Sequence, residues 1–226
     1  MFEDASQLAQ LIDHTLVKPD ATITDIESAC GLAKQYHFAA MIVNSCHVSR
    51  AKAALAGSPV KLGAVVGFPH GASTTTVKIV EAMEAMKNGA EELDIVINIG
   101  LVKSGKLELV EIDIKNVIAM TKGPLHKIIL ETGYLTDAEI ADVCRIAVRS
   151  GAEFVKTSTG YGPRGATVED VQRLRAAVGA TCRVKASGGI RDLATVTAMV
   201  KAGAERIGTS AGPAIMEEYR AKKLAS

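Results

Sequence analysis

Residues 151–160 read Gly-Ala-Glu-Phe-Val-Lys-Thr-Ser-Thr-Gly and join the end of an expected helix to a short, buried strand. The hydroxyls and the glycine that follow Lys156 are typical of the point where a strand gives way to a loop. A lysine is almost never fully buried unless another group pairs with it or uses it. A strand that carries Lys156 inward and ends in a polar loop therefore marks a candidate site for chemistry.

The first three residues of this stretch, Gly-Ala-Glu, recur at 89–91 and at 203–205. Each copy lies between a helix end and a strand, where a glycine supplies the left-handed backbone that ends a helix. The copies are about two strand–helix units apart, so they mark the fourth, sixth and eighth strands of a regular series.

Strand and helix patterns alternate about eight times along the chain. The strands read as continuous apolar runs, typical of strands covered on both faces, and lie near residues 11–15, 39–43, 61–66, 92–98, 127–131, 153–156, 183–187 and 206–208. Capping residues predict helix starts at Thr24, Ser73 and Thr136. The series predicts an α/β fold, a closed eight-stranded parallel (β/α)8 TIM barrel rather than an open doubly wound sheet, and a single domain over residues 1–226.

Composition and charge narrow the classes of partner. Hydrophobic residues make up 48% of the 226 residues and charged residues 23%, as in globular proteins with a full core. The formal net charge is +1 and there is no basic block, so nucleic acid is not an expected partner. No apolar run approaches the roughly 20 residues of a membrane span, and residues 1–6 lack the layout of a secretion signal. Four scattered cysteines favour reduced thiols and a cytoplasmic protein.

Three ionisable residues lie inside apolar strands near the carboxyl ends, where the active sites of such barrels are found: Asp94, Lys156 and Lys185. One reading is an interior salt bridge with a purely structural role. Two lysines on neighbouring strands favour another reading, because burial and mutual repulsion both lower a lysine pKa. A lysine that is partly neutral near pH 7 is what a Schiff-base nucleophile requires.

Two glycine-containing loops indicate phosphate binding. Residues 187–189 read Ser-Gly-Gly before the helix expected near Arg191, and residues 208–210 read Gly-Thr-Ser before the last helix. These are the loops after the seventh and eighth strands, where many such barrels bind phosphate through backbone N–H groups. Either loop alone could hold ordinary turn glycines, but the pair in these positions favours a phosphate site.

Two competing patterns carry less weight. Residues 160–165 match the dinucleotide fingerprint Gly-x-Gly-x-x-Gly, but the next strand carries Lys185 where that fingerprint requires an acidic residue. His14 and His70 fall near strand ends on the expected active face, yet no histidines are paired at metal-ligand spacing. Neither a dinucleotide nor a metal ion is therefore expected.

Several segments of the sequence resemble the deoxyribose-phosphate aldolase family, whose members are class I (Schiff-base) aldolases. The matching segments are spread over nearly the whole chain, in family order: Ile-Asp-His-Thr-Leu at 12–16, Gly-Phe-Pro-His-Gly at 67–71, Glu-Leu-Asp-Ile-Val-Ile-Asn-Ile-Gly at 92–100, Ile-Leu-Glu-Thr-Gly at 129–133, Phe-Val-Lys-Thr-Ser-Thr-Gly at 154–160, Val-Lys-Ala-Ser-Gly-Gly-Ile-Arg at 184–191 and Arg-Ile-Gly-Thr-Ser at 206–210.

The resemblance implies reversible cleavage of 2-deoxy-D-ribose 5-phosphate to acetaldehyde and D-glyceraldehyde 3-phosphate, without an organic cofactor or a metal. Lys156 would form the Schiff base, Lys185 would lower the pKa of Lys156, and Asp94 would be the acid/base partner. The remaining site residues are those of the substrate pocket, Asp13, Thr15, Thr159 and Gly160, and those of the phosphate site, Gly188, Gly189 and Ser210. The expected partners are a small sugar phosphate and an aldehyde, within a homo-oligomer (dimer or tetramer).

The sequence departs from the family pattern in three places. Ile42 and Ser45 stand where the family often has Cys and Pro, and Pro163-Arg164 stands where many members have small residues. Arg164 either adds to phosphate binding or faces solvent. Residues 223–226 lack the terminal tyrosine that some members place over the site, so another group or water is expected to assist the proton step.

Two alternatives remain. One is another lysine-dependent aldolase or transaldolase that acts on a different sugar phosphate. The other is a catalytically silent barrel that binds phosphorylated sugars, whose mark would be the loss of a lysine or of Asp94.

Overall fold

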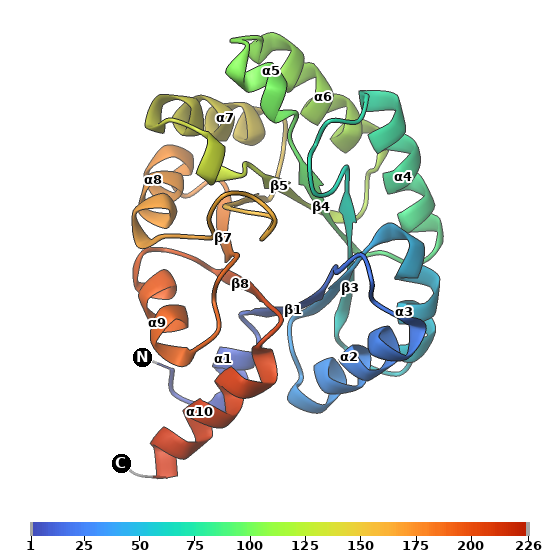
Figure 1. Ribbon diagram of the computed structural model, residues 1–226, viewed down its shortest axis with the longest axis vertical. Coiled ribbons are helices and arrows are strands. Elements are labelled where there is room, and N and C mark those ends of the chain that lie inside the picture. The colour runs from blue at the N-terminus through green and yellow to red at the C-terminus, as the bar shows by residue number, and fades with distance from the viewer. Residues whose placement is uncertain (1, 225–226) are drawn as a thin grey trace.

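Eight parallel strands close into a barrel surrounded by helices in the computed structural model, which describes residues 2–224 (Figure 1). The strands are β1 (Ile12–Leu16), β2 (Ala40–Val43), β3 (Lys61–Val66), β4 (Glu92–Val96), β5 (Leu125–Ile129), β6 (Phe154–Lys156), β7 (Arg183–Ser187) and β8 (Arg206–Thr209). Neighbours in sequence are neighbours in the barrel, and β8 pairs with β1. The predicted TIM barrel is confirmed, with the three Gly-Ala-Glu copies leading into β4, β6 and β8.

The helices follow the strands around the outside of the barrel. They are α1 (Ala5–Ala9), α2 (Ile23–Tyr36), α3 (Val48–Ala54), α4 (Thr75–Lys87), α5 (Ile99–Lys103), α6 (Leu107–Met120), α7 (Asp137–Arg149), α8 (Val168–Val178), α9 (Leu193–Lys201) and α10 (Gly212–Leu224), with short 3₁₀ turns at Ser45–His47 and Thr132–Tyr134. Met1, Ala225 and Ser226, which belong to the chain start and chain end considered above, lie outside the described residues. None of the helices described is long and apolar enough to cross a membrane.

Successive side chains along each strand point alternately into two different cores. One set packs outward against the helices and forms the large apolar core, as Ile12, Met41 and Leu93 do. The other set points into the barrel, where a small apolar group is formed by Ala40, Ile42 and Val65 on β2 and β3. The rest of the interior is largely occupied by charged side chains, which is the feature that positions the site.

Helix starts follow the capping residues, with two shifts from the predicted positions. Thr136 and Glu139 form the predicted capping box at the start of α7. The start predicted at Thr24 is wrong, because Thr22 caps α2 and pairs reciprocally with Asp25. Thr22 and Thr24 each precede an acidic residue by three positions, so both offer the same capping pattern. In the helix capped by Thr22, Ile26 is buried in the core. Thr74 caps α4 instead of the neighbouring Ser73.

Candidate active site

Lys156 ends β6 and lines a cavity of about 340 Å³ at the carboxyl ends of the strands. Its side chain is only 4% exposed, so Lys156 borders the cavity while remaining almost completely buried. The cavity is also lined by most of the predicted substrate and phosphate residues, namely Thr15, Thr159, Gly160, Gly188, Gly189 and Ser210. Asp94, Lys185 and Asp13 are not among the lining residues and are fully buried.

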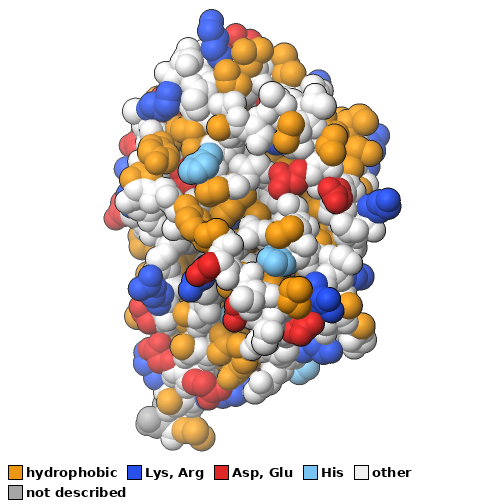
Figure 2. All heavy atoms as spheres, turned by 45° about the vertical axis from the view of Figure 1, so that its right-hand side comes forward, with side chains coloured by type: hydrophobic (Ala, Val, Ile, Leu, Met, Phe, Trp, Pro, Cys, Tyr) orange, Lys and Arg blue, Asp and Glu red, His pale blue; other side chains and the backbone are white. Residues whose placement is uncertain are grey.

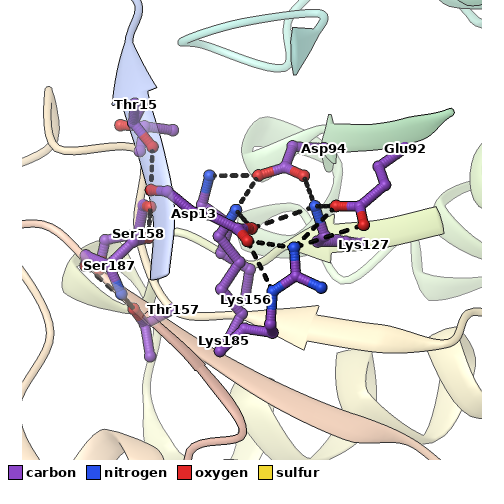
Figure 3. Close-up of polar contacts among 12 residues, drawn as sticks. Asp13, Thr15, Glu92, Asp94, Lys127, Lys156, Thr157, Ser158, Lys185 and Ser187 are labelled. Atoms are coloured by element: carbon purple, nitrogen blue, oxygen red, sulfur yellow. Dashed lines mark hydrogen bonds and ion pairs between the residues drawn. The ribbon is translucent and has the colours of Figure 1, made fainter. Parts of the chain in front are cut away.

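Asp94 binds three ammonium groups at once. Its Oδ2 accepts hydrogen bonds of 2.7 Å from both Lys156 Nζ and Lys185 Nζ, and its Oδ1 accepts one of 2.8 Å from Lys127 Nζ. Lys156 and Lys185 are Cα partners on adjacent parallel strands, as the sequence analysis expected. Figure 3 shows these side chains turned toward one another inside the barrel, with Asp94 reaching across from β4.

Two further carboxylates and an arginine extend this group of charges. Asp13 Oδ2 lies 2.5 Å from Lys185 Nζ and 3.2 Å from Lys127 Nζ, and Asp13 Oδ1 accepts a hydrogen bond of 2.6 Å from Arg206 Nε. Glu92 lies 2.5 Å from Lys127 Nζ and 3.1 Å from the Arg206 guanidinium. Asp13 is fully buried and pairs with two of the amines, but it does not line the cavity. We call these seven residues the interior charge cluster: Asp13, Glu92, Asp94, Lys127, Lys156, Lys185 and Arg206.

The cluster contains one more cation than it has carboxylates, and the pKa values reflect this. Burial acts to raise the pKa of Asp94, but the three lysines outweigh burial and hold that pKa well below its usual value. Burial likewise opposes the charge of Lys127, whose pKa is nevertheless raised by the carboxylates around it. Lys185 differs: burial, assisted by the charges of Lys127 and Lys156, lowers its pKa to about 8.

This geometry divides the chemical roles of the two lysines. Lys156 faces the cavity and is the amine that a carbonyl compound can reach, whereas Lys185 is completely buried. With its pKa near 8, Lys185 can release or take up a proton near neutral pH, and the ionised Asp94 holds it beside Lys156. The arrangement suits covalent catalysis by an amine with a buried proton acceptor beside it. That Lys156 itself is the partly neutral amine stays a prediction.

The far side of the cavity is built by the loops after β7 and β8. Gly188 and Gly189 have φ values of 89° and 78°, a conformation that glycine adopts without strain. Thr209 Oγ1 donates to Ile190 O at 2.6 Å and accepts from Ala211 N–H at 2.9 Å, which ties the two loops together. Lys18 and Arg191 also line the cavity and add positive charge near these loops. This wall is suited to an anion.

The loop of residues 159–165, which includes the fingerprint-like pattern, contributes Thr159, Gly160 and Tyr161 to the lining of the cavity. The Tyr161 hydroxyl donates to Val17 O at 3.1 Å, and the Tyr161 ring meets Phe68 edge to face. Arg164 forms an ion pair with Asp170 and donates to Thr132 O at 3.3 Å. Arg164 therefore anchors the loop to its neighbours. Its side chain is also 41% exposed and does not line the cavity, which agrees with the expected alternative that it faces solvent.

The histidines considered as metal ligands lie apart from the cluster. His14 packs against Phe38 with ring centroids 5.4 Å apart, and burial lowers its pKa to about 4. His70 is exposed. Within residues 2–224 no group of three or more His, Cys, Asp or Glu side chains could hold a metal ion.

Four residues of the site were missed by the sequence analysis. Lys127 is a fully buried lysine in an apolar strand, the same signal that singled out Lys156, so it could have been found. Glu92 and Arg206 open their strands, where a charged residue ordinarily faces solvent. Glu131 follows β5 and gives no comparable signal in the sequence.

The comparisons with known proteins agree with this geometry. Residues 7–218 match the model of the DeoC/LacD family of aldolases. The deoxyribose-phosphate aldolase of Coprothermobacter proteolyticus is 54% identical over 211 residues, covering 93% of this chain and 96% of that protein. The structure of an aldolase designated QR15 has a TM-score of 0.92 at 41% identity, covering 96% of this chain and 97% of that one. The tetrameric deoxyribose phosphate aldolase of Aeropyrum pernix has a TM-score of 0.92 at 32% identity, covering 98% and 94%. The chain belongs to the DeoC/LacD family of aldolases.

Proposed function

We propose that the protein is a class I aldolase that reversibly cleaves 2-deoxy-D-ribose 5-phosphate to acetaldehyde and D-glyceraldehyde 3-phosphate. The observation that carries the proposal is the position of Lys156, whose amine opens into a cavity walled on the far side by the loops after β7 and β8. A sugar phosphate can span this cavity with its aldehyde at Lys156 and its phosphate at Gly188, Gly189 and Ser210. The name of the Coprothermobacter relative supports the same substrate.

The proposed reaction begins with attack of the neutral Lys156 amine on the aldehyde carbon, followed by loss of water to give an iminium. The bond between carbons 2 and 3 then breaks, and its electron pair moves into the iminium to form an enamine. The carbon-3 hydroxyl loses its proton, and its carbon becomes the aldehyde of glyceraldehyde 3-phosphate. Protonation of the enamine carbon and addition of water release acetaldehyde and restore the amine.

The charged residues beside Lys156 take the proton-handling roles. Lys185 and Asp94 form the relay that accepts and returns protons, a role that typically contributes about 10²–10⁴-fold to the rate. Thr15, Thr159 and Gly160 flank the substrate, and Asp13 holds Lys185 in place through their ion pair. Phosphate binding away from the reacting carbons orients the sugar. We expect neither a metal nor an organic cofactor to be required.

Borohydride reduction in the presence of acetaldehyde tests the covalent step. We expect one stable adduct, on Lys156, located by peptide mass mapping. Lys156→Met should abolish the adduct and the activity, whereas substitution of the exposed Lys87 by Met should change neither. No adduct, or one only on Lys185, would overturn the mechanism.

A donor screen tests the substrate. We expect turnover with acetaldehyde as the donor and D-glyceraldehyde 3-phosphate as the acceptor. Turnover with dihydroxyacetone phosphate but not with acetaldehyde would instead identify the protein as another lysine-dependent aldolase.

We further propose that the chain works as a homo-oligomer. Three side chains of α4 that share a helical spacing, Val77, Val80 and Met83, are 53%, 57% and 47% exposed. Figure 2 turns toward the viewer the side of the molecule on which α4 lies, and apolar side chains show between the charged ones there. The tetrameric Aeropyrum relative supports assembly. Light scattering should give a mass above one chain, and Val80→Glu with Met83→Glu should reduce it if this face is buried.

Two broader assignments complete the proposal. We regard residues 1–226 as one catalytic domain, since β1 and β8 pair to close the barrel. We also assign the enzyme to the cytoplasm, because all four cysteines are free thiols and three of them are buried. Fractionation of cells that express the protein tests this location.

A further inference from the structure

Glu131 combines three features that are individually unfavourable. It lies two residues after the end of β5 with φ 56° and ψ 61°, a left-handed conformation that residues other than glycine, asparagine and aspartate rarely adopt. It is 1% exposed, and burial raises the pKa of its carboxyl. Its Oε1 is buried without a hydrogen-bond partner. Strained backbone of this kind persists only where the surroundings hold it, and it is frequent at functional sites.

The other oxygen of Glu131 holds the start of the 159–165 loop. Oε2 accepts hydrogen bonds from the Thr159 backbone N–H, at 3.2 Å, and from the Thr159 hydroxyl. The Thr159 hydroxyl oxygen in turn accepts from Tyr161 N–H at 3.0 Å. A single carboxylate therefore orders consecutive turns of the loop.

Gly162 closes the loop down onto the same carboxylate. A Cβ at this position would lie 2.7 Å from both Cδ and Oε1 of Glu131, so only a glycine fits without a shift. The loop thus rests directly on Glu131, which explains why Oε1 has no water-accessible surface.

The loop also packs against the wall that faces the phosphate. A Cβ at Gly165 would lie 2.2 Å from Gly188 O, and a Cβ at Gly188 would lie 3.6 Å from the Gly160 Cα. Ala166 N–H donates to Gly188 O at 3.1 Å. Displacement of the loop would therefore move Gly188 as well as the Thr159 and Gly160 wall of the cavity.

We propose that Glu131 is a positioning residue that acts through Thr159, holding the 159–165 loop against Gly188 so that the phosphorylated end of the substrate is bound. This rests on the proposed function, in which the substrate spans from Lys156 to the loop containing Gly188. Glu131 makes no hydrogen bond or ion pair with Lys156, although the charge of Lys156 acts to lower the pKa of the Glu131 carboxyl. Formation of the Schiff base with a small, unphosphorylated aldehyde should therefore depend on Glu131 far less than binding of the sugar phosphate does.

The test measures binding of the phosphorylated substrate and formation of the Schiff base at Lys156 separately. Glu131→Gly removes the carboxylate while suiting the left-handed backbone, so the barrel should remain folded. We expect the KM for 2-deoxy-D-ribose 5-phosphate to rise by at least about tenfold, because the loop loses two hydrogen bonds to a carboxylate, while borohydride trapping of acetaldehyde on Lys156 stays within about twofold of wild type. Glu131→Gln keeps an oxygen that can accept from Thr159 and should restore most of the KM.

Thr159→Val supplies the coupling control. If Glu131 acts through Thr159, the double variant Glu131→Gly/Thr159→Val should raise KM no more than the worse single variant, whereas additive effects would overturn this route. Equal losses in trapping and turnover, or an unchanged KM, would overturn the proposal.

Should Glu131→Gly fail to fold, Glu131→Asn tolerates the same backbone with a shorter side chain, and failure of both would make the role of Glu131 purely structural. Wild-type protein that neither traps acetaldehyde nor turns over would refute the proposed function instead.

Discussion

Lys185 lies 2.5 Å from one carboxylate and 2.7 Å from another, yet its pKa is lowered to about 8. Burial removes the hydration of its ammonium group, and two further lysines compete for the same carboxylates. Repulsion between Lys185 and Lys156 is direct, because both donate to Asp94 Oδ2. The two amines therefore cannot be considered independently.

Lys185→Leu should slow turnover and move the pH optimum upward. The variant lacks both the proton acceptor beside the reacting amine and the positive charge that disfavours protonation of Lys156. We expect a loss of about 10²-fold or more in kcat, measured together with the pH profile of kcat/KM. An unchanged pH dependence would show that the two lysines are not coupled.

The same variant should change how stability depends on pH. Because the folded-state pKa of Lys185 is lowered to about 8 from 10.5, the native protein binds this proton less tightly than the unfolded chain. Its contribution to stability is present above pH 10.5 and is lost as the pH falls through 8. As the pH falls from 10 to 7, the wild-type protein should therefore lose stability that Lys185→Leu keeps. The difference in their free energies of unfolding should change by up to about 3 kcal/mol in favour of the variant. Urea titrations at both values measure this gain, and a constant difference would contradict it.

Helices α4 and α6 are joined by a buried ion pair outside the active site. Lys78 Nζ lies 2.6 Å from Asp113 Oδ2, and their side chains are 0% and 6% exposed. Thr75 completes the contact by donating to Asp113 Oδ1 at 2.7 Å. The Lys78 stem also packs under Gly67 in the loop after β3, so the pair fixes two helices and one active-face loop.

Removal of one partner of this pair should cost far more than removal of both. Lys78→Met leaves Asp113 buried without its cation and should lower the free energy of unfolding by about 3–5 kcal/mol, whereas Lys78→Met/Asp113→Leu should recover most of the loss. Lys103→Met breaks a partly exposed pair with Glu139 and should cost less than about 1 kcal/mol. Equal losses in the single and double variants of the buried pair would contradict this account.

The strands and helices could be predicted from the sequence because their signals are local. Apolar runs located all eight strands to within a few residues, and the Thr136 capping box located a helix start. Local signals failed where two positions offered the same chemistry, as Thr22 and Thr24 did. Of the site, Lys156, Lys185 and Asp94 were identifiable because each is a charge inside an apolar strand.

The rest of the site depends on contacts that no single segment reveals. Arg206 looks like an ordinary charged strand start, but barrel closure brings it against Asp13 of β1 and Glu92 of β4. Glu131 acquires its environment from a loop that follows it by about thirty residues in sequence. Such partners are set by the closed topology and are invisible to local periodicity.

Arg206 ties the barrel together as a whole, because it joins the last strand to the first and to one across the interior. Arg206→Met should lower the free energy of unfolding by about 3–5 kcal/mol, since it leaves Asp13 and Glu92 buried with fewer partners. Arg220→Met, which breaks an exposed pair with Glu217 on α10, is the matched control and should change stability by less than about 1 kcal/mol. A similar loss for both arginines in chemical denaturation would argue against the cross-barrel role.

The surplus cation of the interior charge cluster has a consequence for catalysis. In the proposed covalent intermediate Lys156 is a positively charged iminium, and a neutral Lys185 leaves Lys127 and Arg206 as the other cations. Their charges then equal those of Asp13, Glu92 and Asp94. The interior is electroneutral in this intermediate, and it is equally electroneutral in the free enzyme when one of the two amines is neutral. Covalent binding of the substrate at Lys156 therefore requires no change in the net charge of the barrel interior, because the iminium takes the place of an ammonium.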